Sequence, residues 1–423
     1  MSNTLTLLKW NPLRKFGFRF AFIYFLIYSF PFPLSTIPGI SWLSQFYSNA
    51  LTTFIKWIGY FFLGITEIST VPTGSGDTTF SYVSIFSFLL IAITGAIIWS
   101  ILDRKRVNYE KLSTVLIVWL RYYLAFFMLL YGFAKVFVLQ FSDLSLFDLV
   151  KTYGESSPMG LVWNFMEFSD SYTIYTGMGE VLGGVLLLYR RTVTLGCIVT
   201  IAVMATVATL NFSYDVPVKL FSTHLLLIAF YILTPQYKRI FNFLIFNKPV
   251  DIERYLPYFQ NKKWRMARYI AKGLFVTYFL YSQINSGYQN QTRYGKKSPK
   301  PALYGIYNVD HFTINSDTLT PLTTDRFRWR KLIIDKRRSG IRTMQDSSIY
   351  YTAKVSNDTL RLSSRIDTTD VFQMIYKELG DQLILTGTHK KDSISINLTK
   401  IDHTKMLLIS RGYHWVNERP FNR

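Results

Sequence analysis

The chain is poor in cysteine and in charged residues. Of its 423 residues only 17% are charged, and 26 Asp and Glu stand against 47 Lys and Arg, which gives a formal net charge of +21. The single cysteine, Cys197, excludes an intramolecular disulfide framework and any cysteine-rich zinc or iron–sulfur centre. Soluble globular chains carry about 25% charge, and disordered basic chains lack aromatic residues. This chain is 49% hydrophobic and 17% aromatic, which predicts a membrane protein with a basic soluble part.

Seven apolar stretches are long enough to cross a bilayer. A hydrocarbon core of about 30 Å needs about 20 mostly apolar residues when the chain is helical. The predicted spans are Phe16–Leu34, Phe80–Leu102, Leu112–Leu139, Ser171–Leu188, Val193–Phe212, Leu220–Leu233 and Ala267–Ile284. We therefore expect a polytopic α-helical membrane domain over residues 1–284.

The distribution of Lys and Arg predicts the orientation of these spans, because positively charged loops stay in the cytoplasm. Basic residues gather in segments 1–15, 103–111, 190–191 and 236–268, whereas the intervening loops are mainly acidic. This alternation predicts a cytoplasmic (inner) membrane protein with a cytoplasmic N-terminus and an outer, periplasmic or extracellular, C-terminal domain. It also removes nucleic acid as a partner, since much of the positive charge orients the spans.

Two loops between spans are longer than connectors need to be. The segments 40–64 and 144–168 mix apolar and polar residues at helical spacing. Both predict amphipathic helices that lie at the outer membrane interface. For the first segment a re-entrant hairpin is the alternative, and a ligand lid is the alternative to interfacial packing.

The C-terminal third has the pattern of β-strands. From about Ser286 the long apolar runs stop, and short alternating segments such as Ser393–Leu398 begin, separated by turn residues such as Asn357-Asp358 and Gly380-Asp381. The pattern predicts an antiparallel, all-β, barrel-like (lipocalin-like) soluble domain of roughly eight strands. We expect a linker over residues 285–301 and the β domain over residues 302–423.

Charged residues inside spans are costly and usually face a bundle interior or a wet cavity. Arg121 and Glu180 lie at similar depths from the cytoplasmic ends of the third and fourth spans. Because either charge alone would be costly, we expect a buried Arg121–Glu180 pair. Its role is either a structural bridge or the handling of a proton or anion.

Four polar residues occur toward the outer ends of the spans, where we expect them to line one cavity. They are Lys135, Tyr175, Asn211 and His224. The His224 imidazole is suited to act as a base, a quinone hydrogen-bond donor or a metal ligand, although no second ligand at a suitable spacing supports a metal. The alternatives are a His224 with satisfied hydrogen bonds and a Lys135 whose ammonium reaches the interface.

Parts of the third and fourth spans resemble the DoxX family of membrane proteins. The resemblance rests on Arg121, Gly132 and Lys135 in Arg121–Lys135 and on Glu180 and the glycines in Gly179–Leu188, and it covers about residues 112–236. It implies a four-helix core within the seven spans. DoxX-like proteins include a membrane subunit associated with thiosulfate:quinone oxidoreduction and others in redox complexes. The glycines themselves predict close helix packing rather than a nucleotide-binding loop.

The last residues, 411–423, look like the end of longer bacterial DoxX-like proteins that append a β domain. We expect them to form a strand that closes the barrel, with His414 and Trp415 on opposite faces. Together with Glu418, these two residues are candidates for partner docking. The layout of membrane helices followed by an outer β domain is also similar, in topology only, to vitamin K-dependent carboxylases.

These observations leave three hypotheses open. The first is a quinone- or redox-linked membrane subunit whose aromatic residues hold a quinone ring and whose outer domain docks a protein partner. The second is a non-enzymatic assembly or export factor that recruits an outer or membrane partner. The third is a transporter of a small solute. Catalytic candidates are Arg121, Glu180, His224 and Lys135, ligand-binding candidates are Tyr175 and Asn211, and the sequence identifies neither a reaction nor a metal site.

Overall fold

The computed structural model describes residues 9–34, 39, 41–250, 261–364, 366–367 and 369–422. The chain divides into two compact units. The helical unit comprises Met1–Gln140 and Ser169–Tyr288, and the barrel unit comprises Phe141–Phe168 and Gln289–Arg423. The segment 144–168, predicted as a helix at the membrane interface, thus groups with the strands.

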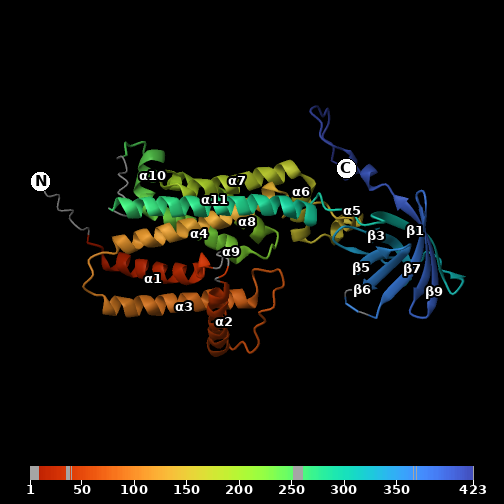
Figure 1. The fold of residues 1–423 in the computed structure, drawn as a ribbon, viewed down its shortest axis with the longest axis horizontal. Helices are drawn as coiled ribbons and strands as arrows, with labels where there is room; N and C mark the ends of the chain where they lie inside the picture. The colour runs from red at the N-terminus through yellow and green to blue at the C-terminus, as the bar shows by residue number, and fades with distance from the viewer. Residues whose placement is uncertain are drawn as a thin grey trace. The chain divides into compact units, whose positions relative to one another are not determined.

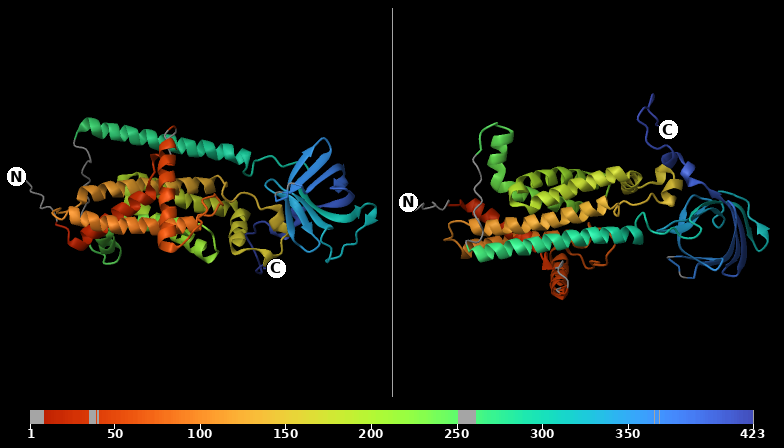
Figure 2. Two further views of the ribbon diagram at one scale, coloured as in Figure 1. Left: turned by 90° about the horizontal axis from the view of Figure 1, so that it is seen from below. Right: turned by 45° about the horizontal axis from the view of Figure 1, so that its top comes forward.

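Long α-helices dominate the helical unit (Figure 1). They are α1 (Pro12–Ser29), α2 (Ser41–Leu63), α3 (Thr79–Leu102), α4 (Glu110–Val136), α7 (Asp170–Leu188), α8 (Val193–Ser213), α9 (Lys219–Leu233), α10 (Tyr237–Leu244) and α11 (Lys262–Arg293), with the 3₁₀ turns η3 (Arg190–Thr192) and η4 (Thr234–Gln236) between them. Helix α2 lies across the other long helices (Figure 2). Helix α11 continues to Arg293, so the predicted linker 285–301 is helical over its first part.

Four helical stretches among the described residues are long and apolar enough to cross a membrane. They are Thr79–Leu102, Glu110–Val136, Arg190–Ser213 and Lys219–Leu244. The other three predicted spans are helical over most of their length, as α1, α7 and α11. These helices are less apolar than the four candidate spans and are not among them. The helical, membrane-type N-terminal region is therefore confirmed, with four candidate spans in place of the predicted seven.

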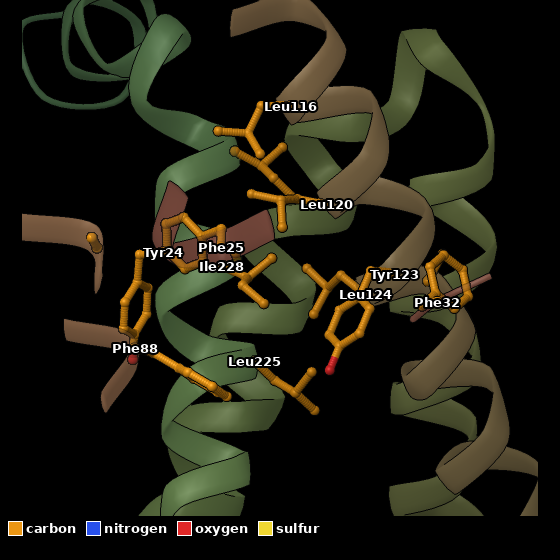
Figure 3. Packing of buried hydrophobic residues seen from close by; sticks show 14 of the residues in the cluster. Tyr24, Phe25, Phe32, Phe88, Leu116, Leu120, Tyr123, Leu124, Leu225 and Ile228 are labelled. Atoms are coloured by element: carbon orange, nitrogen blue, oxygen red, sulfur yellow. The ribbon is translucent and has the colours of Figure 1, made fainter. Parts of the chain in front are cut away.

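The core of the helical unit is built from aromatic and aliphatic side chains of several helices. Figure 3 shows side chains of α1, α3, α4 and α9 converging on one cluster, among them Tyr24, Phe88, Leu120 and Ile228. Helices α4 and α7 approach most closely because glycines lie between them. A Cβ atom on Gly177 would lie 2.8 Å from the carbonyl oxygen of Gly132, so only glycine fits there. This confirms that the glycines serve helix packing.

The barrel unit contains nine strands. They are β1 (Gly305–Ile314), β2 (Asp317–Thr318), β3 (Trp329–Ile334), β4 (Ser339–Thr343), β5 (Ser348–Ser356), β6 (Thr359–Ser364), β7 (Val371–Leu379), β8 (Gln382–His389) and β9 (Asp392–Ile401). Strands β3 to β9 pair antiparallel with their neighbours in sequence, β1 pairs with both β3 and β9, and the two-residue β2 only extends β1. The eight-stranded antiparallel barrel predicted from the alternation is thus confirmed.

Turn chemistry sets the hairpins of this barrel. Asn357 and Asp358, between β5 and β6, both have positive φ, at 44° and 56°, and Gly380 has φ 63° between β7 and β8. Asn, Asp and Gly tolerate this region best, and two such residues in succession match the twist of the strands on either side. Both predicted turns are therefore confirmed.

Aromatic side chains fill the barrel. Phe312 and Trp329 are buried, with ring centroids 5.7 Å apart, and Phe372 lies 5.0 Å from Trp329 on the other side. Lipocalin barrels hold a ligand in this space, whereas here it is a packed core.

Short helices complete the barrel unit. They are α5 (Leu146–Val150), the 3₁₀ turn η2 (Tyr153–Glu155) and α6 (Pro158–Phe168) before the strands, and η5 (His403–Lys405) and α12 (Leu407–Ser410) after them. No strand forms within 411–422, so the prediction of a closing C-terminal strand is wrong. The reason is that β9 pairs with both β8 and β1 and leaves no open edge for a further strand.

Candidate functional site

In the helical unit, Lys135 and Glu180 form a buried ion pair. The Lys135 ammonium donates to Glu180 Oε1 at 2.7 Å, and the two side chains are only 9% and 4% exposed. Glu180 Oε2 is buried without a hydrogen-bond partner among the described residues. The glycine contact between α4 and α7 makes the pair possible, because it brings the two backbones together at that level.

The predicted Arg121–Glu180 pair is wrong. The close approach of Gly132 to Gly177 and of Gly184 to Leu129 fixes the antiparallel register of α4 and α7, and it sets Glu180 near Lys135. Arg121 lies fourteen residues before Lys135 on α4, about 20 Å away along the helix axis. Its guanidinium instead lies 4.9 Å from the ring of Tyr122. The sequence argument compared the depths of Arg121 and Glu180 below the cytoplasmic ends of their spans. It missed the Lys135–Glu180 pair because depth does not tell how α4 and α7 are aligned against each other.

The other polar candidates of the spans have separate surroundings. Tyr175 is 73% exposed on α7, and Asn211 donates to Ser222 Oγ at 3.0 Å. His224 Nε2 is 2.7 Å from the Tyr24 hydroxyl, and its Nδ1 is 2.6 Å from the Leu220 carbonyl oxygen. Lys135 is bound to Glu180 rather than to any of these three. Within the part of the chain that the structure describes, Lys135 and Glu180 are the only two sequence candidates that a hydrogen bond or ion pair joins to each other.

The C-terminal candidates lie on the surface of the barrel unit. Trp415 is 90% exposed, and His414 and Glu418 are exposed as well. The segment folds back on itself, since Arg411 donates to Asn417 Oδ1 at 2.7 Å and Tyr413 packs edge-on against Trp415. Because no strand forms here, the prediction that His414 and Trp415 face opposite sides of one is wrong.

A charged pocket in the barrel unit was not predicted from the sequence. It has a volume of about 690 Å³ and lies between the α5–α6 segment and strands β4 and β5 with the loops beside them. Eight acidic or basic side chains line it: Asp148, Lys151, Glu155, Glu167, Arg337, Arg338, Arg342 and Asp346. Polar and aromatic groups, including Asn164, Trp163 and Tyr350, complete the wall.

Specific contacts hold the α5–α6 segment against the strands. Asp335 Oδ2, at the end of β3, accepts from the Ser145 hydroxyl and from the Leu146 backbone N–H, both at 3.0 Å. Leu146 and Phe147 are buried in a small apolar cluster with Ile306 and Ile333. The aspartate thus caps the start of α5, and the apolar contact fixes the side of the pocket that this segment forms.

One side of the pocket is an ion-pair network around Arg342. Its guanidinium donates to both carboxylate oxygens of Glu155, at 2.8 and 3.0 Å, and to Asp346 Oδ1 at 3.2 Å. The hydrogen bonds from Arg342 lower the pKa of Glu155. One guanidinium nitrogen thus reaches both oxygens of Glu155 while Nε reaches Asp346, so Arg342 connects two acidic residues of the wall.

Glu167 forms a contrasting part of the pocket. It is only 6% exposed, and burial raises the pKa of its carboxyl to about 7. The Arg337 guanidinium lies 3.8 Å from Glu167 Oε1, too far for a hydrogen bond, and counteracts this rise only in part. No hydrogen bond to the Glu167 carboxyl is found among the described residues. With this pKa the carboxyl is about half protonated at pH 7, and it borders a polar cavity.

Sequence reasoning missed this pocket because its two walls are far apart in the chain. The only available signal was charge: the acidic residues of segment 143–167 complement the basic run Lys336-Arg337-Arg338. Within the residues that the structure describes, no group of three or more His, Cys, Asp and Glu side chains is placed to hold a metal ion.

Comparison with known proteins gives one relative. Over 131 residues the chain is 30% identical to YwoB of Bacillus subtilis (strain 168), whose name calls it an uncharacterized protein, and the match covers 31% of this chain and 82% of YwoB. No family model matches the chain, and no solved structure matches it. The DoxX resemblance therefore stays a prediction.

Proposed function

The chain belongs to the same family as YwoB over the 131 residues that the two share, and since that relative is uncharacterized, we propose a function from the geometry. The protein is an integral membrane protein whose barrel unit binds a polar ligand in the charged pocket, without chemical conversion of that ligand. One observation carries the proposal. Glu167, buried and without a hydrogen bond among the described residues, borders a cavity of about 690 Å³.

Two further properties support binding at this place. The cavity volume lies within the range of about 300–1,000 Å³ that small-molecule sites have. The barrel interior is packed with Phe312, Trp329 and Phe372 and has no room for a ligand. Within the barrel unit, the charged pocket is therefore the place where a ligand can bind. Charged groups of both signs in the wall favour a polar ligand over an apolar one.

The proposal includes the orientation and core that the sequence predicts. Basic loops in the helical region favour a cytoplasmic N-terminus and an outer barrel unit, and the DoxX-like core over residues 112–236 would then anchor the pocket at the outer side of an inner membrane. Cysteine substitutions labelled from outside intact cells test this orientation. We expect labelling at barrel residues and protection in the 103–111 loop.

The pocket is tested by the molecules that co-purify with the protein in mild detergent. Asn164→Trp places a large ring in the pocket wall, whereas Phe165→Trp replaces one aromatic ring with a larger one at an exposed position on the same helix, outside the pocket lining. We expect mass spectrometry to find a ligand that the first variant loses and the second keeps. Identical sets of bound molecules in both variants and the wild type would contradict the proposal.

A second candidate is the quinone- or redox-linked membrane subunit. It is favoured by the buried Lys135–Glu180 pair and by His224, whose ring stacks on Tyr28 with centroids 4.2 Å apart. Buried groups that donate hydrogen bonds beside aromatic rings suit a quinone headgroup. Solvent extraction of the native protein tests this candidate. Finding no quinone and no quinol-dependent redox activity would count against it.

An assembly or export role is a third candidate, at a surface that does not line the charged pocket. It is favoured by Trp415, which is 90% exposed near the C-terminus of the barrel unit. Deletion of residues 411–423 should then abolish the capture of a specific membrane or outer protein by the full-length chain. Unchanged capture after this deletion would remove the docking role.

A further inference from the structure

Three of the eight charged residues in the pocket wall, Glu155, Arg342 and Asp346, neutralise one another within the protein. Arg342 binds both Glu155 and Asp346, and Arg330 donates to the same Asp346 carboxylate. These groups have partners already and offer little net charge to a ligand. The lining also holds Asp148, Lys151, Glu167, Arg337 and Arg338, and of these Arg337 and Glu167 form an ion pair at 3.8 Å.

Among these, Glu167 provides a place for a cationic donor. A buried carboxylate without hydrogen bonds is costly, because it loses its hydration and gains no donors. The nearest cation, the Arg337 guanidinium, lies 3.8 Å away. A ligand ammonium, with up to three N–H donors, would supply the missing hydrogen bonds and a second positive charge beside Arg337. Trp163, in the same lining, adds an aromatic surface of the kind that attracts cations.

Beside it, the turn between β3 and β4 provides a place for an anion. Arg337 and Arg338 are consecutive, exposed and part of the pocket lining, and Lys151 lines the pocket from the opposite chain segment. Two guanidinium groups and an ammonium suit a phosphate, whose oxygens accept several charged hydrogen bonds at once, better than a carboxylate.

The short separation between Glu167 and Arg337 links the two places. Since their charged groups are 3.8 Å apart, one ligand meets both only if its own opposite charges are separated by a few bonds. We propose that the pocket binds a phosphoethanolamine group, with its ammonium at Glu167 and its phosphate at Arg337 and Arg338. This inference rests on the proposed function, because it names the ligand class of that pocket.

The cavity is larger than this group, so its remaining volume is left for whatever the phosphate carries. The same chemistry is available from free phosphoethanolamine and from the headgroup of phosphatidylethanolamine. The two sources can be distinguished by measurement. If the natural ligand is the free compound, phosphoethanolamine binds by itself. If it is the lipid, phosphatidylethanolamine binds from detergent micelles even where the free compound does not.

Calorimetric titration of the full-length protein in detergent tests the proposal. We expect O-phosphoethanolamine to bind the wild type, with at least a tenfold loss of affinity in Glu167→Gln and in Arg338→Gln. Glu378→Gln and Arg361→Gln change the same residue types at exposed positions on β7 and β6 that do not line the pocket. These two control variants should bind like the wild type.

Ligand analogues give the same test without a substitution, which matters if a variant fails to fold. Phosphocholine keeps the charge but has no N–H donors, and we expect it to bind at least tenfold more weakly. Ethanolamine and inorganic phosphate, each with one half of the ligand, should also bind at least tenfold more weakly. Equal binding of phosphate and phosphoethanolamine, or tighter binding of serine than of phosphoethanolamine, would overturn the proposal.

Native mass spectrometry with added lipids completes the test. Retention of phosphatidylethanolamine over phosphatidylcholine, lost in Glu167→Gln, would support the lipid source even if the free compound does not bind. If neither phosphoethanolamine nor phosphatidylethanolamine binds, but Asn164→Trp loses a co-purified ligand of other chemistry, the phosphoethanolamine proposal is wrong and the proposed ligand-binding function is supported. If that variant releases nothing and neither form binds, both proposals fail.

Discussion

The Lys135–Glu180 pair should be strongly coupled in stability. Each side chain is at most 9% exposed, and the charged atoms are 2.7 Å apart. Replacing one partner leaves the other as an unpaired buried charge, which costs about 3–5 kcal/mol of the free energy of unfolding. Replacing both by apolar residues of similar size removes both desolvation costs, and such replacements are often neutral or stabilising. The double variant should therefore be more stable than either single variant.

The assay is a double-mutant cycle with Lys135→Met and Glu180→Leu in the purified full-length protein. Free energies of unfolding come from titration of detergent micelles with a denaturing detergent, followed by tryptophan fluorescence. We expect each single variant to lose several kcal/mol and the double variant to recover most of that loss. A parallel cycle with Arg121→Met and Glu180→Leu should be additive within about 0.5 kcal/mol, because these residues share no contact. Single variants as stable as the wild type, or coupling of Glu180 to Arg121, would refute the assigned pair.

Three further predictions concern packing and pH. Gly177→Ala should lower the melting temperature and cost about 1–3 kcal/mol of the free energy of unfolding, because the added Cβ would lie 2.8 Å from the Gly132 carbonyl oxygen. Gly179→Ala is the control and should be nearly neutral, since its nearest contact is at 3.4 Å. Equal melting temperatures of the two variants would contradict this packing. Trp329→Ala should cost about 3–5 kcal/mol in the barrel core, measured by chemical denaturation, and a loss below about 1 kcal/mol would argue against a packed interior. The pKa of Glu167, raised from 4.5 to about 7, means that the native state holds a proton that the unfolded state releases, so stability should fall as pH rises from 4.5 to 7 and level off above it. Glu167→Gln should flatten that decline in melting temperature, and an unchanged pH profile would contradict the buried acid.

The sequence predicted the elements better than their contacts. Apolar length gave helices at each of the predicted spans, and the alternation in Ser393–Leu398 correctly predicted barrel strands. Both signals are local, since they depend on residues a few positions apart. The number of spans was less secure, because hydropathy falls in helices such as α7 that carry Glu180 among small and polar residues.

Contacts between distant segments were the part that could not be predicted. Glu180 pairs with Lys135 because two glycines set the register of α4 and α7, and charge depth alone does not contain that information. The prediction of a closing strand in residues 411–423 was wrong for a similar reason. Strand β1 pairs with the edge of β9 where such a strand would have bound. Glu167 and Arg337 are far apart in sequence, and neither has a motif around it that marks a site.

The most direct test of the account is the identity of the molecules bound to the full-length protein in mild detergent, compared between the wild type, Asn164→Trp and Phe165→Trp. We expect a polar ligand that is present in the wild type and in Phe165→Trp and absent from Asn164→Trp. The same bound molecules in all three proteins, or none in any of them, would contradict a binding function for the charged pocket.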